Sequence, residues 1–393
     1  MSIFFDDDYD SFNYQLEKKR LIDNLEYLKS MSVEEGTLYK KWSENLQYKS
    51  RYDSSINTKS NIWTPSDIQD KAKTIKEIKD LRPELRIAEL EHEQEDWLNL
   101  RLFVSSAPFQ MNPGRLIKYL LVDKNTDKYL AIISIGSDVV VIATRDKLIG
   151  WNKKNKFEDG KLNSTAIGTT IVPTQPFGYN FLGGKLTASM LCTKKVRDDW
   201  KRLYDNTLVA MTTTSLYGQG SMYNGIPFWK SLGESTGKIY LLPDDEHYDI
   251  WHKWVKENLS DEYTRLTIRD QNDTTKGPVT GVKQKIASII MREVGIKASD
   301  YVHGYKRGVY FAPFYDNFKE FLTSQIDETQ LKLKERLEKD VDAILDWWKP
   351  KAINRYLKLY DEGNIKNEML YYNRMPYMTW DETKNLYLKD VGR

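Results

Sequence analysis

The chain has little cysteine, little histidine and no long apolar run. Among its 393 residues, the single cysteine, Cys192, excludes an internal disulfide framework and a metal site built from several thiolates. We expect Cys192 to be a small buried apolar side chain rather than a nucleophile. The four histidines include no pair at a spacing that binds a metal on one helix face. No P-loop, nucleophile elbow or zinc-protease helix occurs either, so we expect no metal cofactor.

Signals for membrane insertion or export are also missing. No apolar run approaches the ~18 residues needed to span a bilayer. The N-terminus, Met-Ser-Ile-Phe-Phe-Asp-Asp-Asp, is acidic where a signal peptide is basic. We therefore expect a cytoplasmic protein with no membrane partner.

The charge of the chain is nearly balanced overall but not locally. A net charge of +2 argues against a protein that is basic throughout. Between Arg265 and Tyr310, however, nine Lys/Arg residues stand against four Asp/Glu residues. This excess favours contact with nucleic-acid phosphates, although a solvated helix face explains it equally well. Under the first interpretation, the nucleic-acid-binding residues are Lys283, Lys285, Arg292, Lys306 and Arg307.

The segment 168–237 has the most informative pattern. Residues 168–173 are apolar and β-branched, a glycine-containing loop follows, residues 185–204 have a helical pattern, and residues 207–214 form a second strand. A helix that begins behind a glycine loop offers unpaired N–H groups to an anion such as pyrophosphate. The predicted cofactor-binding residues are Gln175, Gly178, Asn180, Gly183, Gly184 and Lys185. The alternative is that the glycines only let the loop turn and let the helix pack closely on the sheet.

Short strands precede this unit. The spacing of turns predicts strands over 116–122, 129–135 and 139–143, arranged as an antiparallel meander. The fold class is therefore α+β: a mixed sheet made of a meander followed by strand, glycine loop, helix and strand, with helical N- and C-terminal additions. We predict a helical N-terminal arm (1–83), a core (84–260), a basic helix–hairpin segment (261–325) and C-terminal helices (326–393).

The last two predicted regions have distinct patterns. Residues 281–294 form a helix and 303–311 a hairpin. Leu333, Leu337, Val341, Ile344 and Trp348 form an apolar helical stripe, which Pro350 interrupts. The stripe packs on its own domain or, alternatively, on a second copy in a homo-oligomer.

Polar residues gather after the second strand of the glycine-loop unit. Tyr217, Ser221, Tyr223 and Asn224 follow residues 207–214 within a few positions. A phenol suits proton donation because its pKa of ~10 keeps it protonated at neutral pH. The alternative is that the hydroxyls at this strand end bond to nearby backbone groups.

The order of these elements resembles the cofactor half of the GCN5-related N-acetyltransferase (GNAT) fold. There a Q-x-x-G-x-G/A loop after the fourth strand holds the pyrophosphate of acyl-CoA; here Gln175-Pro-Phe-Gly178 matches, whereas Asn180 replaces the last small residue. The resemblance implies acyl-CoA, or a related phosphate-bearing donor, as cofactor. It also implies that Tyr217 or Tyr223 is the general acid, with Ser221 beside it, and that Asn224 orients a carbonyl or base edge.

Six short segments resemble the DruA-like family, which occurs in the Druantia anti-phage system, with transposable elements and in phages. They lie at 149–151, 180–186, 213–218, 221–224, 229–237 and 303–310. The family resemblance implies a nucleic-acid and phage-conflict context. A looser resemblance, in topology and context, is to the Mom-like phage DNA-modifying proteins.

These observations lead to three hypotheses. The first is a GNAT-like protein that acts on nucleic acid, with DNA as the expected substrate, as a base-modifying acyl- or aminoacyl-type transferase. The second is a DNA-binding module without catalysis, favoured by the bulky Tyr179 and Phe181 in the loop, since a backbone approach to pyrophosphate needs room. The third is a phage structural or assembly protein.

Overall fold

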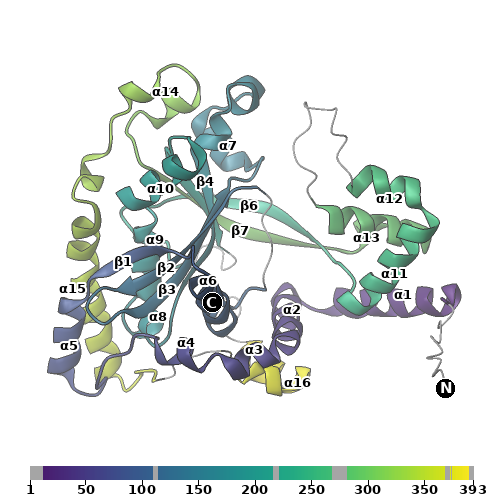
Figure 1. The fold of residues 1–393 in the computed structure, drawn as a ribbon, viewed down its shortest axis with the longest axis horizontal. Coiled ribbons are helices and arrows are strands. Elements are labelled where there is room, and N and C mark those ends of the chain that lie inside the picture. The colour runs from purple at the N-terminus through teal and green to yellow at the C-terminus, as the bar shows by residue number, and fades with distance from the viewer. Residues whose placement is uncertain are drawn as a thin grey trace, which may run out of the picture. The chain divides into compact units, whose positions relative to one another are not determined.

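A seven-stranded mixed sheet is the centre of the fold (Figure 1). The computed structural model describes residues 12–108, 114–215, 221–267, 281–367, 372 and 374–388. The sheet order is β1-β2-β3-β4-β5-β7-β6, so the predicted α+β class with a mixed sheet is confirmed. The strands are β1 (Pro83–Ile87), β2 (Leu116–Asp123), β3 (Lys128–Ser137), β4 (Thr165–Pro173), β5 (Ala210–Ser215), β6 (Lys230–Tyr240) and β7 (Val302–Pro313).

One strand pair of the sheet, β4 and β5, is parallel, whereas the pairs on either side of it are antiparallel. Strands β1 to β4 are antiparallel neighbours, and β5 is antiparallel to β7. Between them, β4 and β5 are parallel, and they pair only from Thr165 opposite Ala210 to Gly168 opposite Thr213. Beyond Gly168, β4 continues beside β3 alone. The parallel pair therefore ends partway along β4, and the helices of the glycine-loop unit connect its two strands.

Helices precede, connect and follow the strands. The N-terminal and crossover helices are α1 (Tyr14–Ser30), α2 (Val33–Gln47), α3 (Lys49–Ser54), α4 (Ile56–Ser60), α5 (Lys71–Asp80), α6 (Glu91–Val104), α7 (Ala143–Ile149), α8 (Phe177–Asn180), α9 (Gly183–Met190) and α10 (Lys194–Tyr204). The later ones are α11 (Asp245–Asn258), α12 (Ser260–Thr267), α13 (Val282–Glu293), α14 (Phe318–Leu322), α15 (Asp340–Asp361) and α16 (Trp380–Tyr387). No described helix is long and apolar enough to cross a membrane.

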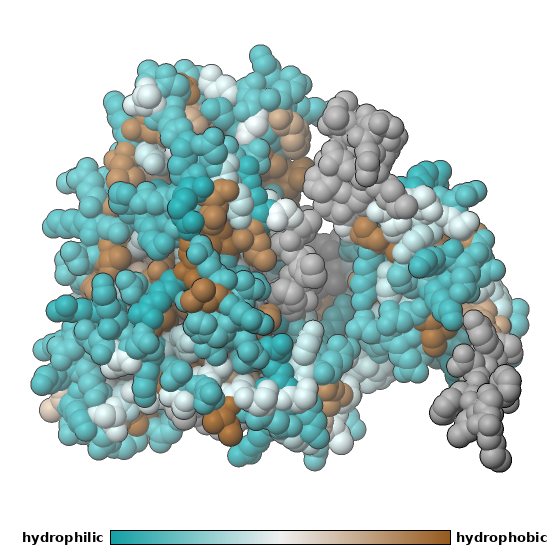
Figure 2. Space-filling view, in the orientation of Figure 1, coloured by the Kyte–Doolittle hydropathy of each residue, from teal (hydrophilic) through white to brown (hydrophobic). Residues whose placement is uncertain are grey.

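The described contacts divide the chain into two compact units. One unit lies within Met1–Gly36 and Gly237–Tyr305, and the other within Thr37–Thr236 and Lys306–Arg393. In the smaller unit, the buried Trp251 of α11 donates from its indole to the Glu17 carbonyl of α1 at 3.4 Å. In the larger unit, apolar side chains of the sheet, α9, α10 and α15 form one continuous core. The face visible in Figure 2 is largely hydrophilic, with hydrophobic residues in separate patches.

Burial explains why the central strands form. Strand β3 buries all of residues 130–136, as is typical of a strand covered on both faces. Helix α6 packs on it, and the Trp97 indole donates to the Ile133 carbonyl at 3.0 Å. Cys192 is also buried, in the turn between α9 and α10, and burial raises the pKa of its thiol to about 12. The interpretation of Cys192 as a small apolar side chain is thereby supported.

Four predicted elements differ from the structure. Residues 139–143 are not a strand: Val139–Val141 are exposed, and α7 begins at Ala143. The hairpin over 303–311 is instead the single strand β7, because Gly304 and Gly308 both lack the positive φ that a tight turn requires. The helix over 185–204 is divided into α9 and α10. Pro350 does not interrupt α15, since Trp348 and Ala352 on either side of it are fully buried and hold the helix in the core.

Two other predicted elements have clear outcomes. Helix α13 agrees with the helix predicted over 281–294. The predicted apolar stripe packs in its own unit, where Leu337, Ile344 and Trp348 are buried, but it is not one helix: Leu333 and Leu337 precede α15, which begins at Asp340. Self-association through this helix stays a prediction that would need another face.

Candidate functional site

The segment after β5 folds back onto the N-terminus of α9. The Asn224 side-chain oxygen accepts a hydrogen bond of 3.1 Å from the Tyr310 hydroxyl of β7. The Lys185 ammonium of α9 donates to the Asn224 backbone carbonyl. Asn224 itself is exposed. The predicted catalytic segment and the predicted phosphate loop thus meet, and we call Lys185, Asn224, Tyr223 and Tyr310 the polar cluster.

The other predicted catalytic residues are more deeply placed. Tyr223 is 7% exposed, and its ring lies 5.0 Å from that of Tyr310 and 5.5 Å from that of Trp229. The buried Ser221 hydroxyl accepts from the Tyr223 backbone N–H at 3.2 Å. This bond is the turn-stabilising role that the alternative interpretation assigned to the hydroxyls. Tyr217 lies outside the described residues.

The glycines of the loop lie in tight packing. A Cβ at Gly183 would approach the Phe177 ring to 2.5 Å, and one at Gly184 would approach the Met222 sulfur to 2.7 Å. A Cβ at Gly178 would lie 2.7 Å from both Pro173 and the Gln175 amide nitrogen. The constraint is firmest at Gly183, where the Cβ would also lie 3.0 Å from the Gly178 Cα, while at Gly184 the flexible Met222 side chain would have to shift. This geometry supports the packing interpretation, and a pyrophosphate approaching Gly184 from that side would need Met222 to move.

Gln175 and Asn180 bond to the protein backbone. The Gln175 side-chain oxygen accepts from the Tyr179 N–H at 3.0 Å. The fully buried Asn180 donates to the Lys366 carbonyl at 2.6 Å and accepts from the Lys366 N–H at 3.1 Å. Asn180 thus ties the loop to the segment after α15. This contact gives a physical reason for the asparagine where the GNAT pattern has a small residue.

Lys185 is the predicted cofactor residue best placed to meet an anion. It is half-buried at the beginning of α9, and burial together with the charge of Lys351 holds its pKa below the usual value. Within the described chain, the one polar contact of its ammonium group is with the Asn224 carbonyl. Phosphate binding by this loop stays a prediction, with Lys185 as its main support.

The predicted nucleic-acid-binding residues of the smaller unit are mostly neutralised. Lys283 pairs with Asp245 at 2.6 Å. Arg292 pairs with Glu262 at 2.8 Å and with Glu293 at 2.7 Å, and these partners raise its pKa. Lys285 is exposed. Carboxylates beside these cations weaken the positive potential on which the prediction rests.

Two predicted nucleic-acid-binding residues lie in the larger unit. Lys306 pairs with Glu234 at 3.4 Å. Arg307 is half-buried, and burial lowers its pKa. Neither residue is an exposed, uncompensated cation of the kind that contacts a phosphate backbone most strongly.

A buried charge network lies next to β5, beside the sequence segment 149–151. Asp138 and Arg145 form an ion pair of 2.6 Å in which both side chains are fully buried. The Thr212 hydroxyl donates to Asp138 at 3.0 Å, and Arg145 also lies over the Trp151 ring. Burial raises the pKa of Asp138, and the guanidinium opposes that effect. The network fixes α7 against the sheet, which gives Trp151 a structural role.

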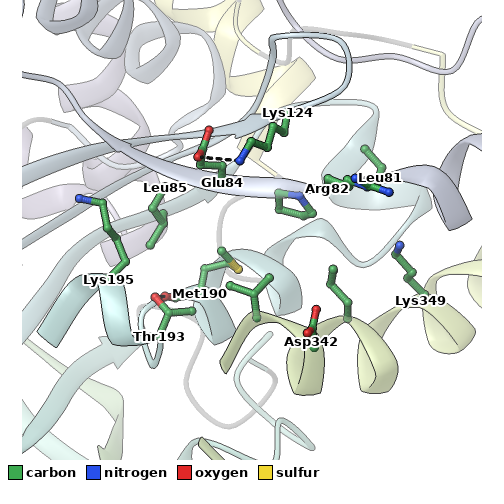
Figure 3. A pocket seen from close by; sticks show the side chains of 13 residues that line it. Leu81, Arg82, Glu84, Leu85, Lys124, Met190, Thr193, Lys195, Asp342 and Lys349 are labelled. Carbon is green, nitrogen blue, oxygen red and sulfur yellow. Dashed lines mark hydrogen bonds and ion pairs between the residues drawn. The ribbon is translucent and has the colours of Figure 1, made fainter. Parts of the chain in front are cut away.

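A pocket of about 620 Å³ lies elsewhere in the larger unit, between β1, the α9–α10 turn and α15 (Figure 3). Its volume falls within the range of small-molecule sites. None of the predicted site residues lines it, so the sequence did not indicate this pocket. Its walls are apolar and its rim carries charges of both signs, including the Glu84–Lys124 pair at 3.5 Å. The lining residues are Leu81, Arg82, Pro83, Glu84, Leu85, Lys124, Met190, Thr193, Lys195, Val341, Asp342, Leu345 and Lys349.

Comparisons with known proteins place the chain in one family. The model of the family described as Druantia protein DruA matches residues 37–324. A curated relative, the Druantia protein DruA of Escherichia coli (strain UMEA 4076-1), is 26% identical over 279 residues. The match covers 66% of this chain and 66% of the relative, so the chain spans slightly less than two thirds of that relative's length. No solved structure matches.

Proposed function

Because the chain belongs to the Druantia DruA family, we propose that it acts on nucleic acid, with DNA as its substrate, in anti-phage defence. The name of the relative associates that protein with the Druantia system. Defence at the level of nucleic acid is our extension of that name. The proposal includes a GNAT-like sheet and a site at the polar cluster.

The connectivity of the sheet supports the GNAT-like part of the proposal. An antiparallel series ends in the fourth strand, β4, and Gln175 and the glycine loop follow it directly. Helices α8 to α10 then lead to β5, which is parallel to β4. This is the arrangement of strand, loop, helix and strand that the resemblance implies for the cofactor half of the fold.

One observation carries the choice of site: Lys185 of α9, Asn224 of the segment after β5, and Tyr310 of β7 are joined by hydrogen bonds. These residues come from three elements around the open end of the β4–β5 pair. A phenol, an amide and an ammonium group together can donate to a base edge, orient it and attract a phosphate. In this proposal the exposed Asn224 contacts the base, and Tyr310 holds its side chain in place.

A base-modifying transferase is the finer candidate, with acyl-CoA or a related phosphate-bearing compound as donor. Its residues would be Lys185 for a donor phosphate and Tyr217 or Tyr223 for proton donation. A nucleic-acid-binding module without catalysis is the second candidate. The contact of Met222 with Gly184 favours it, because it fills one side of the loop that would hold the donor.

Three measurements on the full chain separate the candidates. Acetyl-CoA is titrated in a thermal-shift assay, nucleosides from DNA of cells expressing the protein are analysed by mass spectrometry, and DNA binding is measured at increasing salt concentration. For the transferase, we expect stabilisation and a new nucleoside mass that Asn224→Ala abolishes while the protein stays folded. Unchanged nucleosides together with salt-sensitive DNA binding support the binding module. Absence of DNA binding at low salt, together with unchanged nucleosides, contradicts both.

A further inference from the structure

Two cations lie over one tyrosine ring next to the glycine loop. The Arg355 guanidinium is 5.1 Å from the centroid of the Tyr179 ring, and the Lys366 ammonium is 4.3 Å from it. Tyr179 belongs to α8, Arg355 to α15, and Lys366 follows α15. Asn180 fixes the Lys366 backbone with two hydrogen bonds, so this arrangement is anchored to the protein interior.

Two further lysines extend the positive charge towards the polar cluster. Lys351 is exposed one turn before Arg355 on α15, and its ammonium lies 5.7 Å from the Trp347 ring centroid. Its charge helps to lower the pKa of Lys185, so the two ammonium groups are close enough to repel each other. Lys185 in turn contacts the Asn224 carbonyl. We call Tyr179, Lys185, Lys351, Arg355 and Lys366 the α15 basic surface.

Three cations of this surface differ from other cations of the same unit in their carboxylate partners. In the part of the chain that the structure describes, Lys185, Lys351 and Arg355 form no ion pair. Other cations of the same unit are paired: Lys201 with Glu328 at 3.3 Å, and Arg202 with Glu89 at 3.3 Å. Like charges gathered without counter-charges are costly unless an anion joins them. The cations come from α9, from α15 and from the segment that follows α15, and this spread suits several phosphates in a row better than one (Figure 1).

We infer that the α15 basic surface binds the phosphodiester backbone of DNA and leads the strand to Asn224 in the polar cluster. The inference rests on the proposed action on nucleic acid. It assigns backbone contact to residues that differ from the basic segment 265–310. Tyr179 adds an aromatic ring among the cations, a combination typical of surfaces that follow a nucleic-acid strand.

The test compares two double variants of the full chain with equal loss of charge. Lys351→Gln/Arg355→Gln removes two cations of the surface, and Lys201→Gln/Arg202→Gln removes two paired cations of α10. Binding of a short fluorescein-labelled DNA duplex is measured by anisotropy, from about 50 to 200 mM salt. For the first variant, we expect the slope of log K against log salt to fall by about 1.8, at about 0.9 per phosphate contact. For the control, we expect a slope close to that of the wild type.

The outcomes separate the inference from the function on which it rests. If the wild type binds DNA and the first variant binds with the same slope, the α15 basic surface is not the contact, and the proposed function survives. If the wild type does not bind DNA even at low salt, both fail. A first variant that binds DNA normally but loses stabilisation by acetyl-CoA assigns the surface to a small phosphate ligand and overturns the inference. If the double variant does not fold, Lys351→Gln alone carries the test, with an expected slope change of about 0.9.

Discussion

The contact between Gly184 and Met222 predicts that Gly184→Ala destabilises the wild-type protein but stabilises the Met222→Ala variant. Gly184 has no positive φ, so alanine is compatible with its backbone. In a helix, alanine is favoured over glycine by up to about 1 kcal/mol, and less near the first turn. However, the new Cβ would lie 2.7 Å from the Met222 sulfur, well inside normal contact. Such overpacking costs about 1–3 kcal/mol, so we expect Gly184→Ala to destabilise the wild type by about 1–2 kcal/mol.

In the Met222→Ala background the obstructing sulfur is absent. There Gly184→Ala should stabilise the fold by about 0.5 kcal/mol, giving a coupling energy of about 2 kcal/mol, within the usual range for residues in contact. Urea unfolding of the four proteins, followed by tryptophan fluorescence, measures this coupling. Gly183→Ala is the control: its Cβ would lie 2.5 Å from the Phe177 ring and 3.0 Å from the Gly178 Cα, so Met222→Ala should not rescue it. Equal effects of Gly184→Ala in both backgrounds would refute the packing of this segment on α9.

Three further predictions concern buried polar groups of the larger unit. Burial lowers the pKa of Lys41 to about 7 in the folded protein, from 10.5 in the unfolded chain. Between these two pH values the unfolded chain binds one proton more than the folded protein does. The free energy of unfolding should therefore rise with pH across this range. The free energy of unfolding, measured with urea at about pH 7 and about pH 9, should differ less between the two pH values in Lys41→Met than in the wild type. An equal difference in both proteins would show that Lys41 does not cause the rise. Asp138→Ala should cost about 2–4 kcal/mol, because the buried Arg145 then keeps Asp146, at 2.7 Å, as its carboxylate partner. A loss below about 1 kcal/mol in urea unfolding would exclude a structural role for the network. Asn180→Ala should lower the free energy of unfolding by about 2–3 kcal/mol through its two lost backbone hydrogen bonds, and an unchanged unfolding midpoint would show that they do not anchor the loop.

The sequence predicted the elements whose patterns are local. The alternation and turns around 116–135 gave β2 and β3, and the periodicity of 281–294 gave α13. It could not predict that Val139–Val141 leave the sheet, because their β-branched side chains favour a strand and the opposing cause is tertiary. The buried Asp138–Arg145 pair turns the chain into α7 at that point. Likewise, Pro350 ends a helix by local rules, and only the burial of Trp348 and Ala352 overrides them.

The candidate site was predictable in part. Sequence order placed Lys185 and Asn224 in two separate predicted sites, and the structure joins them by a hydrogen bond. Tyr310 entered the prediction only as the last residue of the segment 303–310, because its contact with Asn224 depends on the pairing of β7 with β5. The α15 basic surface did have a signal, namely Lys351 and Arg355 at a spacing of four on one helix face. The helix was interpreted by its apolar stripe alone, so these two cations were not predicted as a binding surface.

Ultraviolet crosslinking of the full chain to DNA, with mass spectrometry of the crosslinked peptides, shows directly whether the α15 basic surface and Asn224 contact DNA. We expect crosslinks in the peptides that carry Tyr179, Asn224 and residues 347–366, with crosslinking weakened by salt. Crosslinks confined to the peptides that carry Lys283 to Arg292, or no crosslinks at low salt, would show that these residues do not bind DNA.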